Sequence, residues 1–161
     1  MASDYLLEID GIKGESHDSK HKGTIEISSF SWGASQGGTH GSGGGGGAGK
    51  VSFQDLHFTS TVNIASPKLA EACATGKHLK KAVLYVRKAG GKQEEYYKVT
   101  LSDVLVSNYQ LGGQSKGSVL PVDQFSLNFA KIEYEYKPQK QDGSLDAGLK
   151  MVYDLAKNTA G

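Results

Sequence analysis

Apolar and polar residues alternate along most of this chain, with the period of two that is typical of half-buried β-strands. Tyr5, Leu7 and Ile9 share one face of the first predicted strand, and Asp10-Gly11 begins a turn. The same alternation predicts further strands over residues 25–32, 51–64, 83–86, 97–106 and 125–136. Residues 148–155 supply a final strand, so strands dominate the chain.

Two of these strands change phase. The apolar positions move from Ile27 to Phe30 across Ser28–Ser29, and from Phe129 to Ile132 in a later strand. A slip of one residue within a regular strand is what a β-bulge produces. We therefore predict a bulge at Ser28–Ser29.

One segment has the period and the boundary signals of a helix. Ser66 suits the N-cap, Pro67 the first helical position, and Gly76 the position beyond the end. The short helix, at about residues 67–75, is predicted to close one end of the sheets with Cys73 as a small buried apolar side chain. The pattern as a whole predicts a mainly β protein: a closed β-barrel of two antiparallel sheets in one domain over residues 1–161.

Composition narrows the function classes. The 161 residues include 18 Lys and Arg against 17 Asp and Glu, which gives no net field to favour nucleic acid or membrane insertion. A single cysteine excludes an internal disulfide and fits a reducing cytoplasm. The N-terminal residues lack the basic start and apolar core of a signal peptide, and no apolar run is long enough to span a membrane.

The glycine-rich run over residues 43–50 resembles the sequence motif of a nucleotide-binding loop. Residues 44–50 satisfy G-x-x-x-x-G-K, but Val51 stands where a P-loop needs Ser or Thr, and a strand follows instead of a helix. Neither a magnesium ligand nor a helix dipole is predicted there. The run instead predicts a long loop that becomes ordered on contact with another chain.

Two further sets of residues suggest a metal site or a base-stacking surface, but their surroundings favour structural roles. His17, Asp18 and His21 have a spacing that metal ligands also use, but the surrounding residues are polar and turn-like, which favours a solvated loop. Tyr97, Tyr134 and Tyr136 would suit base stacking, yet they fall in phase with apolar neighbours and are predicted to pack in the core. No cofactor or metal site and no catalytic residue is predicted. The alternative is a small ligand-binding or enzymatic β-barrel whose site combines residues distant in sequence.

Several ordered motifs together resemble one family. They begin with Asp10-Gly11-Ile12-Lys13-Gly14-Glu15-Ser16 and continue through residues 30–33, 43–51, 66–67, 72–73, 76–78, 87–91, 101–107, 112–113, 126–131, 136–139 and 142–144. In order and register they resemble the Hcp (haemolysin-coregulated) proteins, which form the inner tube of bacterial type VI secretion systems. One departure is Val152-Tyr153-Asp154, where members often have Gly-Trp-Asp.

The resemblance implies a structural protein and not an enzyme. Six copies of the barrel would close into a homohexameric ring, and stacked rings would form a tube. A contractile sheath would propel this tube, and a VgrG-type spike would cap it. Effector proteins would ride in the ring's lumen, with the ring as carrier and chaperone. The chain would be made in the bacterial cytoplasm and secreted by the type VI machine without a signal peptide.

If the chain forms such a tube, two sets of residues are candidates for contacts with adjacent rings and with effectors. The ring-stacking loop is predicted to be Gly43, Gly44, Gly45, Gly46, Gly47, Ala48 and Gly49, with an inert excursion as the alternative. If Phe30 and Trp32 are buried, Ser29 and Ser31 point the other way. We expect them to face the lumen and touch effectors, because small hydroxyl groups bond adaptably without closing the passage. The alternative places them outside the ring or against a neighbouring subunit.

Overall fold

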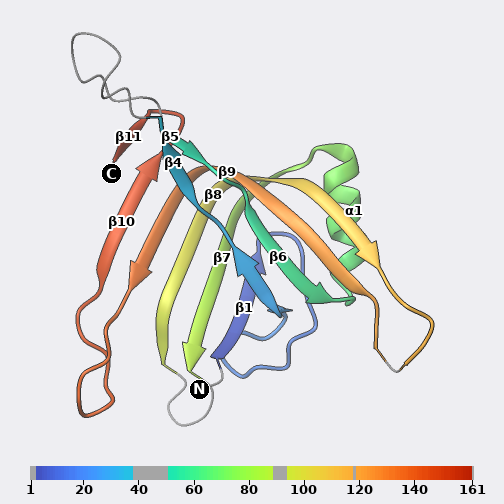
Figure 1. Cartoon of the computed structure of the whole chain (residues 1–161), viewed down its shortest axis with the longest axis horizontal. Coiled ribbons are helices and arrows are strands. Elements are labelled where there is room, and N and C mark those ends of the chain that lie inside the picture. The colour runs from blue at the N-terminus through green and yellow to red at the C-terminus, as the bar shows by residue number, and fades with distance from the viewer. Residues whose placement is uncertain (1–2, 38–50, 89–93, 118, 161) are drawn as a thin grey trace.

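The computed structural model describes residues 3–37, 51–88, 94–117 and 119–160, and Figure 1 shows their arrangement. Eleven strands and one helix follow in the order β1 (Ser3–Ile9), β2 (Ile25–Ile27), β3 (Ser29–Ser31), β4 (Ala34–Gln36), β5 (Val51–Phe53), β6 (Leu56–Thr61), α1 (Ser66–Thr75), β7 (His78–Lys88), β8 (Glu95–Gly112), β9 (Val122–Tyr136), β10 (Leu149–Asp154) and β11 (Thr159–Ala160). All strand pairs are antiparallel. The mainly β prediction is confirmed, and the strand predicted over residues 148–155 is β10, which the short β11 follows.

The segment of residues 25–31 closes the barrel. Its first half, β2, pairs with β1, whereas its second half, β3, pairs with β6. β6 continues to β9, β9 to β8, β8 to β7, and β7 back to β1. The predicted bulge at Ser28–Ser29 is therefore wrong. The slip in phase marks the point where the chain leaves one sheet and joins the other, and Ser28 N–H bonds to Thr59 O at 2.8 Å.

Strands β8 and β9 are long because each serves both sheets. In β8 the buried positions change from Leu101 to Val104, and in β9 they change from Phe129 to Ile132. The two changes lie opposite each other, since Ser102 pairs with Lys131 and Val104 with Phe129. Asp103, between them, has a φ of 55°, a backbone conformation that L-residues rarely adopt. The two strands therefore turn the corner of the barrel together.

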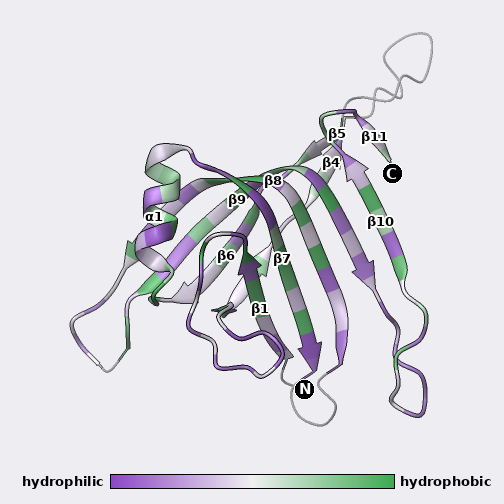
Figure 2. Ribbon diagram, turned by 180° about the vertical axis from the view of Figure 1, so that it is seen from behind, coloured by the Kyte–Doolittle hydropathy of each residue, from purple (hydrophilic) through white to green (hydrophobic). Residues whose placement is uncertain are grey.

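Two layers result, and Figure 1 shows one crossing in front of the other. We call the layer of β3, β6, the first half of β9 and the second half of β8 the short sheet. The long sheet contains β2, β1, β7, the other halves of β8 and β9, β10 and β11. Apolar and polar bands alternate along β7 and β8 in Figure 2, as expected for strands with one face on the core.

The core between the layers contains fully buried Leu7, Ile25, Leu56, Leu84, Leu101 and Phe125, among others. Tyr97 and Tyr134 pack against it edge to face, with ring centroids 4.8 Å apart, and burial raises the pKa of Tyr97 to about 12. Tyr136 does not follow this prediction, because it is 43% exposed. Phe30 and Trp32 are half-buried and pack on the core as expected.

Helix α1 covers one end of the barrel, with Leu69 and Ala72 buried and Cys73 half-buried against the core. Gly76 ends it in the left-handed conformation, as predicted. The N-cap prediction is wrong: Ala65 occupies that position, and Ser66 lies within the first turn. The Ser66 hydroxyl instead donates to the buried carboxylate of Asp123 on β9, which ties the helix to the short sheet. Among the described residues, no helix has the length and apolar character needed to cross a membrane.

Candidate functional site

The outer surface of the short sheet carries polar side chains from four adjacent strands. Strand register arranges eight of them in two rows. One row runs Ser31, His57, Ser126, Asn108, and the other runs Ser29, Thr59, Gln124, Gln110. We call these eight residues the uncharged face, because none of them carries a fixed charge.

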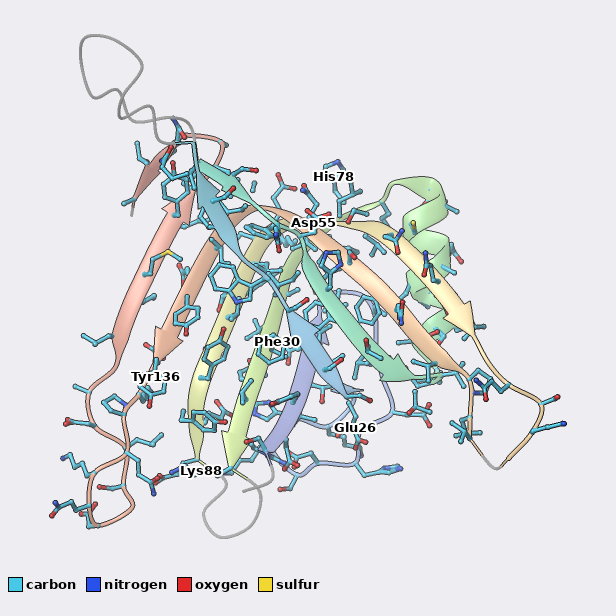
Figure 3. The ribbon with its side chains drawn as sticks, in the orientation of Figure 1. Glu26, Phe30, Asp55, His78, Lys88 and Tyr136 are labelled. Carbon is cyan, nitrogen blue, oxygen red and sulfur yellow. The ribbon has the colours of Figure 1, made fainter. Side chains whose placement is uncertain are left out.

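Ser29 and Ser31 are exposed on β3, and Phe30 between them lies on the core side, as Figure 3 shows. The predicted direction of both serine side chains is thus observed, although their role is a separate question. Their cross-strand partners are Thr59 and His57.

His57 and Ser126 form the tightest contact on the uncharged face. His57 Nδ1 lies 2.5 Å from Ser126 Oγ, and Ser126 is only 3% exposed. The hydroxyl both donates and accepts, so this contact suits the neutral and the protonated imidazole alike.

Asp55 comes directly before β6 and two residues before His57, at the upper end of β6 in Figure 3. It accepts hydrogen bonds from Ser107 Oγ at 2.6 Å and from Asn128 Nδ2 at 2.9 Å. An open depression of about 500 Å³ is lined by Asp55, by Ser107 and by members of the uncharged face. Such a surface offers many hydrogen bonds and little fixed charge.

The outer surface of the long sheet differs in charge. Lys98, Glu133, Glu135 and Lys150 gather there, and Lys150 Nζ lies 3.3 Å from a Glu133 carboxylate oxygen. The two outer surfaces of the barrel are therefore chemically distinct, one charged and one uncharged.

The segment of residues 13–24 packs against the long sheet, contrary to the predicted solvated loop. Asp18 binds the buried guanidinium of Arg87, and this hydrogen bonding holds the pKa of Asp18 well below its usual range. His21 stacks on Tyr85 with ring centroids 4.1 Å apart and contacts Glu95. The metal-like spacing thus belongs to a structural anchor, and among the described residues no three His, Cys, Asp or Glu side chains gather as a metal site would require.

The glycine-rich loop prediction, Gly43 to Gly49, lies outside the described residues. Val51 begins β5, so the strand expected after the run is confirmed. β5 pairs with β4 in a separate two-stranded sheet.

Sequence reasoning found the two serines but missed the six other members of the uncharged face. His57, Gln110, Gln124 and Ser126 belong to no recognisable sequence motif. Alternation with Phe125 and Leu127 places Ser126 on the polar side of its strand, whereas Gln110 lies beyond the strand predicted over residues 97–106. The strand order places both beside the serines.

Comparison with known proteins identifies the family. Residues 6–136 match the family described as "Type VI secretion system effector, Hcp". The chain is 45% identical to "Protein hcp1" of Pseudomonas aeruginosa, over 98% of both chains. Its fold resembles "Structure of a type six secretion system protein" with a TM-score of 0.93 and 31% identity, over 99% of this chain and all of the other. It also resembles the crystal structure of Hcp1 from Salmonella typhimurium, with a TM-score of 0.78 and 34% identity over 99% of this chain and all of the other. The chain belongs to the Hcp family of type VI secretion system proteins.

Proposed function

We propose that this protein forms a homohexameric ring, that the rings stack into the injected tube of a type VI secretion system, and that effector proteins bind in the lumen. The contractile sheath and the VgrG-type spike are the further partners that this role requires. Family membership over residues 6–136 supports the secretion role.

Two apolar patches support self-assembly. On the long sheet, Tyr136, Leu149 and Met151 are 43%, 75% and 37% exposed on the side that faces the core elsewhere along the strands. This part of the sheet extends past the short sheet, at the left of Figure 1. The second patch contains Leu111 and Leu120, which are 56% and 61% exposed near the turn that joins β8 to β9.

The two patches lie at opposite ends of the molecule's long axis (Figure 1). Different patches at opposite ends favour a head-to-tail contact, and such a contact gives a ring when its rotation closes. We therefore propose a second copy of the chain as the occupant of both patches.

The observation that carries the lumen assignment is the contrast between the two outer surfaces of the barrel. A passage that must hold and release different proteins benefits from small uncharged donors and acceptors, which bond adaptably and make no strong ion pairs. The uncharged face, with Ser29 and Ser31, meets this requirement better than the charged surface of the long sheet. We propose that it lines the lumen.

Replacement of Ser31 tests the lumen assignment. Ser31→Gln and Ser31→Glu add bulk on an exposed side chain without touching the core. A lumen position predicts intact hexamers and normal secretion of the protein, with loss of effector binding. Hexamers that dissociate would place Ser31 at a subunit contact instead.

The glycine-rich loop is proposed to contact the adjacent ring. Replacing Gly43 to Gly47 with a short turn is expected to leave the hexamer intact while impairing tube assembly and secretion. Unchanged assembly and secretion would favour the inert excursion.

A further inference from the structure

The uncharged face contains one side chain whose charge changes near neutral pH. Histidine titrates between pH 5 and 8, whereas serine, threonine, asparagine and glutamine do not. His57 is exposed and occupies the second position of its row, between Ser31 and Ser126. A change in its protonation therefore changes the charge of the whole surface.

One charged group lies among the side chains around His57. β3 contributes Ser29 and Ser31; β9 contributes Gln124, Ser126 and Asn128; and β8 contributes Ser107, Asn108 and Gln110. Asp55, just before β6, is the one ionisable group among these neighbours. Its carboxylate accepts bonds from the neutral donors Ser107 and Asn128 and keeps its negative charge. Protonation of His57 therefore offsets one negative charge beside it.

Protonation of His57 does not require the fold to change. When the imidazole carries a proton on Nε2 alone, the Ser126 hydroxyl can donate to Nδ1; when both nitrogens carry a proton, Nδ1–H can donate to the same oxygen. The rows of the uncharged face keep their geometry in both states, and only the charge differs.

We propose that His57 is a specificity-determining residue of the cargo surface. With a neutral imidazole the carboxylate of Asp55 disfavours proteins that present acidic segments; a protonated imidazole offsets that charge, so acidic segments bind more tightly and basic ones less tightly. This inference rests on the proposed function, because a ring brings six copies of His57 around one lumen, where their charges act on the same cargo.

The test uses hexa-aspartate and hexa-lysine peptides, each carrying a dye whose emission does not change with pH. Fluorescence anisotropy measures their binding to the intact protein at pH 7.5 and 5.5 in low salt, because salt screens exposed charges. Aspartate stays ionised at both values, since its reference pKa is about 3.9. We expect hexa-aspartate to bind about tenfold more tightly at pH 5.5, the size of a few charge contacts at a hydrated surface. Hexa-lysine binding weakens over the same change.

Two variants isolate His57. His57→Gln keeps a polar side chain beside Ser126 and removes the titration, so its hexa-aspartate affinity changes less than about twofold between the two pH values. His57→Lys carries a fixed charge and binds hexa-aspartate tightly at both. His17→Gln, which removes an exposed histidine from the segment on the long sheet, is the matched control and retains the wild-type response.

Sedimentation of each sample separates the two claims. Hexamers in which His57→Gln keeps the full pH response, or in which wild type shows none, overturn the role of His57 and leave the ring intact. A protein that sediments as a monomer overturns the proposed ring, and the six-histidine lumen with it.

Discussion

Arg87 and Asp18 form a paired, hydrogen-bonded contact across 69 positions of sequence, with the Arg87 side chain 4% exposed and the Asp18 side chain 13% exposed. Asp4 lies on the other side of the guanidinium, 3.3 Å from Nε. This contact fastens the segment of residues 13–24 onto β7 and explains why this polar segment is held against the sheet.

Asp18→Ala is expected to lower the free energy of unfolding by about 3 kcal/mol, because it leaves a buried guanidinium with only its weaker partner. Urea denaturation at fixed protein concentration measures the change. Asp142→Ala is the matched control, since among the described residues Asp142 bonds only within an exposed turn. A loss for Asp18→Ala no larger than the control's would show that the ion pair does not hold the segment.

The same pair makes stability depend on acid. The pKa of Asp18 is depressed in the folded protein, mainly by its hydrogen bonds to Arg87. Its contribution is therefore complete above the unfolded value of about 3.9 and is lost as the pH falls below it. Wild type is expected to lose stability more steeply than Asp18→Asn between about pH 4 and 2. Parallel curves for the two proteins over that range would contradict the assignment.

Asp123 is a fully buried carboxylate with a structural task. It accepts a bond from Tyr109 Oη at 2.6 Å and another from Ser66, and it is fully buried beneath the uncharged face. Burial is the main reason that the pKa of Tyr109 rises to about 12. Asp123→Ala leaves the buried Ser66 hydroxyl and the half-buried Tyr109 hydroxyl without this acceptor, so we expect a loss of about 2–3 kcal/mol in urea denaturation.

Ser60, whose Cα faces Asp123 in the register, supplies the control. Its buried hydroxyl has no hydrogen-bond partner among the described residues, so Ser60→Ala is expected to be neutral or slightly stabilising. Equal losses for Ser60→Ala and Asp123→Ala would attribute the effect to packing rather than to hydrogen bonds.

These contacts show what the pattern of residues can and cannot predict. Alternation located the strands and the core face, because burial acts on each strand locally. It read the change of phase at Ser28–Ser29 as a bulge, because a strand that changes partners gives the same local signal. The Arg87–Asp18 pair and the rows through His57 depend on strand order and loop path, which local patterns do not encode.

The apolar patch on β10 gives a prediction about assembly. Leu149→Lys places a charge in the patch that we assign to the subunit contact, so hexamers should dissociate while circular dichroism stays unchanged. Val152→Lys adds the same charge on the opposite face of the strand, where Glu133 is its cross-strand neighbour, and should leave the hexamer intact. Dissociation by both variants, or by neither, would contradict the assignment of this patch.

The mass of the native particle tests the central claim most directly. Native mass spectrometry of the untagged protein at micromolar concentration is expected to give about 103 kDa, six times the 17.1 kDa of one chain. A mass of 17.1 kDa under the same conditions would contradict the ring, and with it the lumen that the uncharged face is proposed to line.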